Sequence, residues 1–217
     1  MALVVRLEFF TILAKRLNFA SPARNLMGRS QVAMDDPADR IYERLLLLRC
    51  QAGNADAFAE LVERYGPRLR YFVRRMLGDD DTAEDVLQEV WLDVFRGLGG
   101  LLDLGAFPAW VYRIARDRTA RRLRRPQLPR EPAKDVSEIE AAGGAEEFSA
   151  EDAAAIHAAL SELTPDQREV LVLRFLEEMS YDDIAKVVGG PVGTVRSRLH
   201  YAKRALRTIL ERKTKHE

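Results

Sequence analysis

One stretch of twenty residues, "YDDIAKVVGGPVGTVRSRLH", constrains the fold of this chain more than any other. Its fifth residue is Ala185, its ninth is Gly189 and its fifteenth is Val195. Two helices that cross steeply need a small residue where they touch, and the turn between them needs a residue that tolerates positive φ. The second helix also needs an apolar anchor toward the first. This spacing predicts a helix-turn-helix, with further apolar contacts from Ile184, Val188 and Leu199.

The side chains of this helix that do not point inward are basic or hydrogen-bonding. Arginine can pair bidentately with guanine, and each good pair discriminates against the wrong base by about 1–3 kcal/mol. A solvated basic helix in an ordinary bundle is the alternative, but charge alone does not explain the small and apolar residues at their intervals. We therefore expect contacts to the DNA groove and phosphates from Thr194, Arg196, Ser197, Arg198, His200, Tyr201, Lys203 and Arg204.

The rest of the chain favours an all-α fold of two small helical domains. Apolar residues recur at helical spacing, and strand patterns are almost absent. Thr164, Pro165 and Gln167 form a capping box with proline in the first helical turn. We expect helices at Ala38–Arg49, Asp56–Tyr65 (ended by Gly-Pro), Arg68–Leu77 (ended by Gly78), from Asp81 or Thr82 to Arg96, at Pro108–Arg125, from Thr164 to about Glu177, and after a Ser180 cap.

Formal charge is balanced, with 34 basic and 34 acidic residues, so its distribution is more informative than its sum. In "GDDDTAEDVLQEVWLDVFR", Asp85, Glu89 and Asp93 recur every four residues, with Gln88 and Trp91 close by. Acids at a helix start are favourable for the helix dipole, which explains the aspartates of 79–81 but not Glu89 or Asp93. The pattern predicts one helix face that combines carboxylates with an amide, and it favours Trp91 in the core over a surface contact.

The next helix, "AFPAWVYRIARDRTARRLRRP", carries seven arginines between residues 113 and 125 against the single Asp117. Arginines hold phosphates, and an aromatic ring that reaches the surface stacks on an unpaired base, a contact worth about 1–3 kcal/mol. Trp110, Val111 and Ile114 also fit a core. So one-sided a charge predicts a nucleic-acid surface with contacts from Trp110, Tyr112, Arg113, Arg116, Arg118, Arg121 and Arg122.

Composition also predicts the domain boundaries. Between Arg130 and Asp152 the chain has eight acids and is rich in Pro, Ala and Gly, which is typical of a flexible linker. We expect domains at 35–126 and 152–213, joined by a linker at 127–151. Cys50 is the only cysteine, which excludes an internal disulfide and a multi-cysteine zinc site, and we expect a buried thiol in a reducing compartment.

These segments resemble a known family. The segment from Leu160 to Leu206, and "PVGTVRSRLHYAKRAL" in particular, resembles the fourth domain of sigma-70-type RNA polymerase sigma factors of the extracytoplasmic-function (ECF) group. "AEDVLQEVW" is similar to the helix that docks on a coiled coil of the largest subunit of core polymerase. The resemblance implies that Thr194, Arg196, Ser197, Arg198 and His200 contact the minus-thirty-five element, and that Asp85, Gln88, Glu89 and Asp93 bind core polymerase.

The resemblance also gives a role to the basic helix and to the loop before it, residues 97–107. In the family this region recognises and melts the minus-ten element and holds an extruded base, whose unstacking costs a few kcal/mol. Two positions depart from the family pattern. Gly190 replaces an apolar residue, and Asp117 stands where "IARN" is common, which places a negative charge near the DNA face.

The resemblance implies a promoter-specificity subunit without catalytic residues, cofactor, metal or small-molecule substrate. Its expected partners are core RNA polymerase, promoter DNA and an anti-sigma factor. A free-standing repressor or activator is an alternative, but it leaves "AEDVLQEVW" unexplained. An enzyme would need a metal held by Asp79, Asp80, Asp81, Glu84 and Asp85, yet the three histidines are scattered and no glycine-rich phosphate loop appears.

Residues 1–34 lie outside the usual extent of the family. "LEFFTILAKRLNFASPARNLMGRSQVAM" weakly resembles the opening helices of a LysR-type winged helix-turn-helix. It fits an upstream start with Met27 or Met34 as initiator, a regulatory extension, or the remnant of a fusion, and we favour the first. No segment reaches the roughly 20 apolar residues that span a bilayer, since Arg6 and Glu8 interrupt the apolar start. We expect a cytoplasmic protein.

Overall fold

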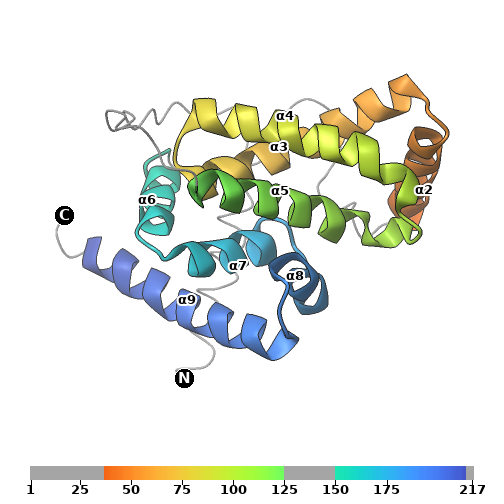
Figure 1. The fold of residues 1–217 in the computed structure, drawn as a ribbon. Coiled ribbons are helices and arrows are strands. Elements are labelled where there is room, and N and C mark those ends of the chain that lie inside the picture. The colour runs from red at the N-terminus through yellow and green to blue at the C-terminus, as the bar shows by residue number, and fades with distance from the viewer. Residues whose placement is uncertain (1–36, 125–149, 214–217) are drawn as a thin grey trace. The chain divides into compact units, whose positions relative to one another are not determined.

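The computed structural model describes residues 37–124 and 150–213, and every regular element in these two ranges is a helix (Figure 1). None of the described helices is long and apolar enough to cross a membrane. The described residues fall into two compact units. One contains α2–α5, and the other contains α6–α9 apart from the last three residues of α8, Lys186–Val188. The prediction of an all-α fold with two helical domains is confirmed. The predictions for residues 1–34 and for residues 127–149 of the predicted linker at 127–151 lie outside the described residues. The last two linker residues, Ala150 and Glu151, are instead the first residues of α6.

The first unit contains α2 (Pro37–Gln51), α3 (Ala55–Leu77), α4 (Asp80–Gly97) and α5 (Phe107–Arg124). Two short 3-10 turns, η4 (Leu98–Gly100) and η5 (Leu104–Ala106), connect α4 to α5. Aromatic pairs in the core join α3 to α5. The rings of Tyr65 and Phe107 meet edge to face at 5.0 Å, and those of Phe72 and Tyr112 at 5.4 Å. This core fixes how α5 lies against the rest of the unit.

The prediction that Gly66-Pro67 ends a helix is wrong, because α3 continues through Pro67. Proline has no amide hydrogen, so the carbonyl of Glu63 loses its intrahelical donor. The buried stripe of α3 nevertheless continues on both sides of the proline, from Leu61 to Leu69. Burial of this stripe offsets one missing hydrogen bond, and the two predicted helices form one.

The turn between α3 and α4 also differs from the prediction by a few residues. Gly78 ends α3 in the left-handed region at φ 74°, as expected of a helix-terminating glycine. The N-cap of α4 is Asp79, not Asp81 or Thr82, and its carboxylate accepts from the backbone amide of Thr82 at 3.2 Å. Asp79 has extended backbone angles, which the cap position requires, whereas Asp81 and Thr82 are already helical.

The second unit contains α6 (Ala150–Ser161), α7 (Pro165–Phe175), α8 (Tyr181–Val188) and α9 (Val192–Lys213). The capping box of Thr164 and Gln167 is present, and Ser180 caps α8 by accepting from the amide of Asp183 at 3.0 Å. Both caps are confirmed. Helix α7 ends at Phe175, two residues before the predicted end.

Two predictions of burial in the first unit need adjustment. Cys50 is only partly buried, because it lies in the last turn of α2, and this burial raises the pKa of its thiol. Trp91 is also partly exposed, although its ring packs edge to face on Phe58 with centroids 6.1 Å apart. Both side chains belong to the margin of the core.

Candidate docking and nucleic-acid surfaces

Helices α8 and α9 form the predicted helix-turn-helix. Gly189 ends α8 at φ 69°, where an L-residue with a side chain is strained, and the amide of Thr194 donates to the carbonyl of Pro191 to begin α9. Ile184 and Val195 are completely buried, and Leu199 is nearly so. The turn and apolar positions found in the sequence therefore have the structural roles predicted for them, and they fix which face of α9 points outward, whereas Ala185, predicted as the small contact residue, is partly exposed.

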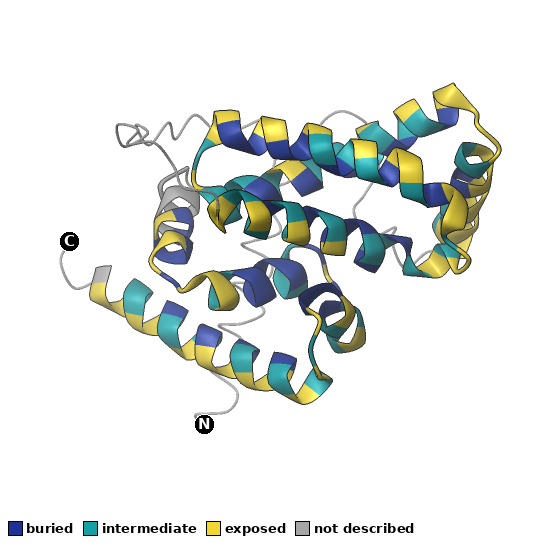
Figure 2. Cartoon of the chain, viewed as in Figure 1, coloured by how far each residue is buried: buried dark blue, intermediate teal, exposed yellow. Residues whose placement is uncertain are grey.

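Helix α9 has an exposed side along its first three turns (Figure 2), and the residues on that side are mostly polar or basic. We call the exposed residues the recognition face, and they follow helical spacing: Arg196, Ser197, His200, Tyr201 and Arg204. The other predicted residues, Thr194, Arg198 and Lys203, are partly buried beside it. The structure thus places all eight residues on one helix and divides them into an outer and a flanking group.

The flanking residues contact neighbouring helices. A guanidinium nitrogen of Arg198 lies 3.2 Å from the carboxylate of Asp166 in the first turn of α7. The ammonium of Lys203 lies 5.3 Å from the ring centroid of Phe175, and burial, followed by the charge of Arg174, lowers the pKa of Lys203. Lys203 is therefore more closely tied to the domain than the residues of the recognition face.

Helix α4 presents a stripe that combines carboxylates with large apolar side chains. The exposed residues recur every three or four positions, and we call them the α4 stripe: Asp81, Asp85, Gln88, Leu92 and Phe95. Leu92 is 52% exposed and Phe95 is 68% exposed. No role was predicted for these two apolar residues from the sequence, although their spacing from Asp85 and Gln88 places them on the same face.

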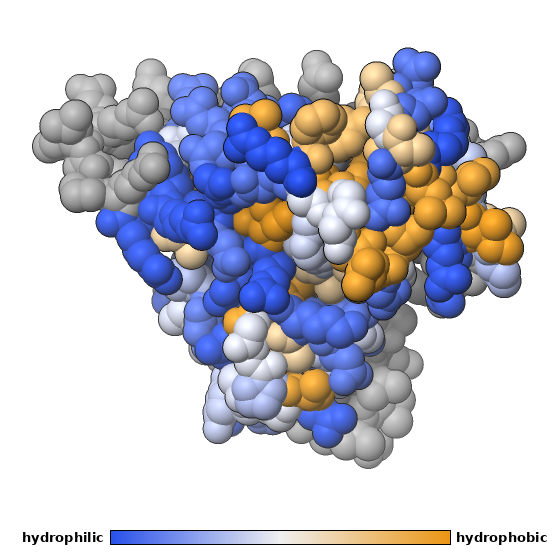
Figure 3. Space-filling view, turned by 45° about the vertical axis from the view of Figure 1, so that its right-hand side comes forward, coloured by the Kyte–Doolittle hydropathy of each residue, from blue (hydrophilic) through white to orange (hydrophobic). Residues whose placement is uncertain are grey.

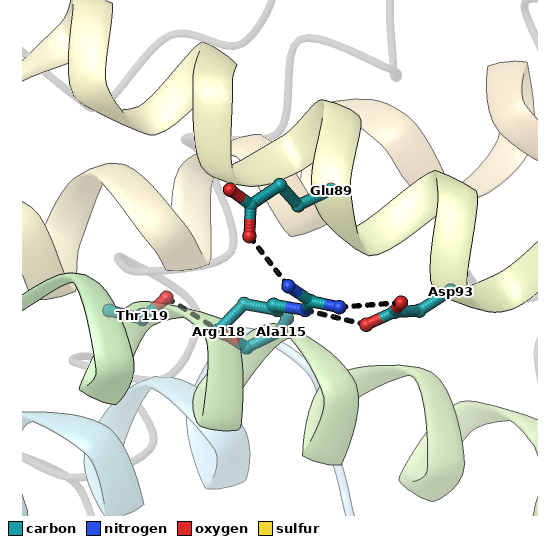
Figure 4. Close-up of polar contacts among 5 residues, drawn as sticks. All are labelled: Glu89, Asp93, Ala115, Arg118 and Thr119. Carbon is teal, nitrogen blue, oxygen red and sulfur yellow. Dashed lines mark hydrogen bonds and ion pairs between the residues drawn. The ribbon is translucent and has the colours of Figure 1, made fainter.

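Glu89 and Asp93 lie one step around α4, on the side that faces α5. There they hold Arg118 (Figure 4). The Nε and Nη2 atoms of Arg118 donate to the two carboxylate oxygens of Asp93, both at 2.6 Å, and Nη1 donates to Glu89 at 2.7 Å. The hydrogen bonds that Arg118 donates to Asp93 are the main cause of its raised pKa, and Glu89 adds to this effect. Two predicted docking residues and one predicted DNA-binding residue thus bind one another.

The remaining arginines of α5 lie at or near the surface. Arg113 and Arg121 are exposed, Arg116 and Arg122 are partly buried, and Arg116 lies 3.6 Å from the carboxylate of Asp117. Tyr112 departs from the predicted surface role. It is only 2% exposed and packs on Phe72, so it belongs to the core and does not reach a base in this conformation.

Trp110, the other predicted aromatic contact, is partly buried and lies beside the end of α4. A Cβ atom added to Gly97 would approach the Cζ2 atom of Trp110 to 3.0 Å. Only glycine therefore lets the indole pack so closely against this turn. The ring also lies 6.0 Å from that of Phe107, centroid to centroid.

The loop between α4 and α5 is hydrogen-bonded to the end of α2 and exposes one apolar residue. The side-chain amide of Gln51 donates to the carbonyls of Leu98 and Leu101, both at 2.9 Å, and the carboxylate of Asp103 accepts from the amide of Gly105 at 2.9 Å. Leu102 is 97% exposed. This loop was predicted from the sequence as part of the DNA-binding region, but no role was predicted for Gln51 or Leu102, since nothing in their local pattern distinguishes them.

A further apolar surface lies on α2. Ile41, Leu45 and Leu48 follow helical spacing and are 67%, 53% and 52% exposed. Figure 3, turned to bring the side with α2 forward, shows hydrophobic side chains gathered on this side of the molecule. No role was predicted for this surface from the sequence.

The acids at the start of α4 make structural contacts. Asp79 caps the helix, Asp80 accepts from Nη2 of Arg74 at 2.6 Å, and Glu84 pairs with Nε of Arg70 at 2.6 Å. Across residues 37–124 and 150–213, no group of three or more His, Cys, Asp or Glu residues could hold a metal ion. Helix capping and ion pairs therefore explain Asp79, Asp80 and Glu84, three of the acids that the enzyme hypothesis assigns to a metal.

Comparison with known proteins matches both helical units. The family model described as "Sigma-70 region 2" matches residues 61–127, and "Sigma-70, region 4" matches residues 153–206. RNA polymerase sigma-H factor of Pseudomonas aeruginosa is 33% identical over 181 residues, which cover 78% of this chain and 94% of that protein. ECF RNA polymerase sigma-E factor of Escherichia coli (strain K12) is 34% identical over 182 residues, with the same coverage.

Two solved structures share the fold. CnrH, solved in complex with the cytosolic domain of CnrY, has a TM-score of 0.59 and 26% identity, and the match covers 78% of this chain and 97% of that one. The sigma factor RpoE from Bartonella quintana, solved with the anti-sigma factor NepR, has a TM-score of 0.54 and 23% identity, covering 71% of this chain and 96% of that one.

These observations define a class of helical protein with two units. One unit contains a helix-turn-helix, and the other presents an acidic, partly apolar helix. The chain belongs to the sigma-70 family of RNA polymerase sigma factors, in its ECF group. Its role is promoter-specific initiation of transcription with RNA polymerase, as a specificity subunit and not as an enzyme.

Proposed function

We propose that this sigma factor binds core polymerase and the two promoter elements through three separate surfaces. The α4 stripe, with Glu89 and Asp93 beside it, binds core polymerase. The arginines of α5 and the loop before it bind the minus-ten element, and the recognition face of α9 binds the minus-thirty-five element. The units that carry these surfaces correspond to domains at 35–126 and 152–213, joined by the segment at 127–151.

The α4 stripe is the observation that carries this proposal. Leu92 and Phe95 are large apolar side chains that the fold leaves in water, next to the carboxylate of Asp85 and the amide of Gln88. Large exposed apolar side chains beside polar groups are typical of a protein interface. A solvated helix face would not need two large apolar residues among its charges.

Run-off transcription with core polymerase tests the docking role. We expect the double variant Asp85→Ala, Phe95→Ala to bind core polymerase at least about 10-fold more weakly, a loss of about 1.4 kcal/mol, and to lose initiation in proportion. Glu63→Ala is the matched control, because Glu63 is an exposed acid on α3, outside the stripe. Equal binding by the double variant and the control would exclude the α4 stripe as a docking surface.

The DNA-binding role of α9 is tested by the same assay on promoters altered in one element. Arg196→Ala and Arg204→Ala replace two exposed arginines of the recognition face. A residue that contacts base edges loses discrimination at one position by about 1–3 kcal/mol, whereas a phosphate contact weakens all sequences alike. A repressor or activator would instead bind promoter DNA without initiating transcription when core polymerase is added.

We further propose an anti-sigma factor as regulator, and the cytoplasm as the place of action. CnrH, which resembles this chain at 26% identity, was solved with the cytosolic domain of CnrY. A polypeptide that covers the α4 stripe would compete with polymerase for the same exposed apolar residues. The cytoplasm is proposed because the protein meets its partners, core polymerase and promoter DNA, in that compartment.

A further inference from the structure

Arg118 connects two helices for which different partners are proposed. It belongs to α5, the DNA-binding helix, but its guanidinium points to α4 and binds Glu89 and Asp93 (Figure 4). All three of its nitrogen atoms donate to carboxylate oxygens, at 2.6 to 2.7 Å. In this conformation the guanidinium of Arg118 binds carboxylates of α4, so it is not directed toward a DNA phosphate.

The ion pair is placed where partners can compete for it. The side chains of Arg118, Glu89 and Asp93 are 25%, 46% and 29% exposed, so solvent and ligands reach all three. One guanidinium also faces two carboxylates, which leaves a net negative charge on this side of α4. A basic residue of a partner would find a site for charge-assisted hydrogen bonds there, and a phosphate would find the same kind of site at Arg118.

We propose that Arg118 couples polymerase binding to DNA binding by exchanging its partners. When a basic side chain of core polymerase binds Glu89 and Asp93, Arg118 is released to bind a promoter phosphate. When DNA binds Arg118 first, the two carboxylates become available to polymerase. This inference rests on the proposed function, in which α4 docks on polymerase and α5 binds DNA.

The coupling is reciprocal by thermodynamic necessity. If polymerase raises the affinity of the chain for DNA through Arg118, DNA raises its affinity for polymerase by the same factor, and such factors are typically about 5- to 150-fold. The free chain would then bind each partner weakly and both together strongly. An ion pair that only stabilises the fold predicts no such factor, and this difference makes the two roles separable.

The first test measures binding of the free chain to a labelled single-stranded oligonucleotide. Glu89→Gln, Asp93→Asn removes the two carboxylates and releases Arg118, and we expect an affinity gain of about 5-fold or more. The matched control Asp81→Asn, Asp85→Asn removes the same charge from the same helix without touching Arg118. Adding Arg118→Gln should abolish the gain of the first variant.

Salt dependence gives a second result from the same experiment. One additional phosphate contact on single-stranded DNA makes the slope of log affinity against log salt steeper by about 0.7. We expect this steepening in Glu89→Gln, Asp93→Asn only while Arg118 is present. A similar gain in both acid variants, or a gain that survives Arg118→Gln, would show a general charge effect and overturn the proposal.

The second test measures affinity for core polymerase in the absence of DNA. Arg118→Gln frees the carboxylates from their internal competitor, so it should bind polymerase several-fold more tightly, whereas Arg113→Gln, on the exposed side of α5, should not. Unchanged or weaker binding by Arg118→Gln, with its thermal unfolding unaltered, would overturn the coupling. Failure of every variant, including the wild type, to bind polymerase would instead refute the proposed function.

Discussion

Gly189 allows the cost of the helix-turn-helix turn to be measured apart from packing. Its φ is +69°, and a Cβ atom added there would meet nothing within 4 Å. The expected penalty of Gly189→Ala is therefore conformational, about 1–2 kcal/mol for an L-residue in the left-handed region. The same substitution lowers the entropy of the unfolded chain, which returns about 0.4–1 kcal/mol.

Gly193 provides a control for this second contribution. It lies in the first turn of α9, its φ is not in the left-handed region, and a Cβ atom there would also meet nothing within 4 Å. Gly193→Ala should stabilise the unit by about 0.5–1 kcal/mol. Both variants alter the unfolded chain alike, so the difference between their free energies of unfolding isolates the cost of the turn. This difference is about 1–2 kcal/mol, to which any gain in helix propensity at Gly193 adds.

Amide hydrogen exchange in the full chain is a suitable assay, since neither of the two tryptophans lies in this unit. Peptides from α8 and α9 should exchange roughly 5- to 30-fold faster in Gly189→Ala than in Gly193→Ala. Peptides from α3, in the other unit, serve as an internal reference. Equal exchange in the two variants would refute the argument from φ, and faster exchange in Gly193→Ala would reverse it.

Four further predictions concern single side chains. Gly97→Ala should displace Trp110 and change its fluorescence, whereas Gly99→Ala, with nothing within 4 Å of an added Cβ, should not. Pro67→Ala restores an amide donor to the carbonyl of Glu63 and should raise the stability of the first unit, by up to about 3 kcal/mol, in tryptophan-detected urea unfolding; a lower urea midpoint would contradict this. Asp117→Asn removes the carboxylate beside Arg116 and should strengthen DNA binding, with a steeper salt dependence than the wild type; unchanged affinity would place Asp117 away from DNA. Burial lowers the pKa of Lys203 in the folded chain below its ordinary value of 10.5. Between the folded and the unfolded pKa the unfolded chain binds more protons, so the stability of the second unit rises with pH. Lys203→Met should lose this rise without a lower unfolding temperature at pH 7, and it should bind DNA more weakly.

The helix-turn-helix could be predicted from the sequence because its rules are local. A small residue, a positive-φ glycine and an apolar anchor at fixed intervals are enough to specify α8, the turn and α9. The same kind of rule failed at Gly66-Pro67, where a breaker pair lies within α3. There the buried stripe on both sides of Pro67 outweighs the local signal, and the sequence of the turn alone does not contain that information.

The pairing at Arg118 could not be predicted for a different reason. Its partners Asp93 and Glu89 are 25 and 29 residues away, on another helix, so no spacing rule within α4 or α5 brings the three together. Tyr112 shows the same limit, since whether an aromatic residue of α5 reaches the surface depends on where Phe72 of α3 lies. Sequence patterns found the two charged helices, but only the packing of α3, α4 and α5 decides which charges face each other.

The packing of α4 on α5 brings opposite charges together within a chain whose net charge is zero. The acids of α4 and the arginines of α5 lie on adjacent helices, joined at Arg118, so their fields overlap within the roughly 8 Å over which salt screens charges at physiological strength. The free unit therefore attracts DNA less than the arginines of α5 would alone. A basic partner that covers α4 neutralises the acids and leaves the field of the arginines uncompensated, so docking on polymerase would strengthen the attraction of α5 for DNA without any change in the fold.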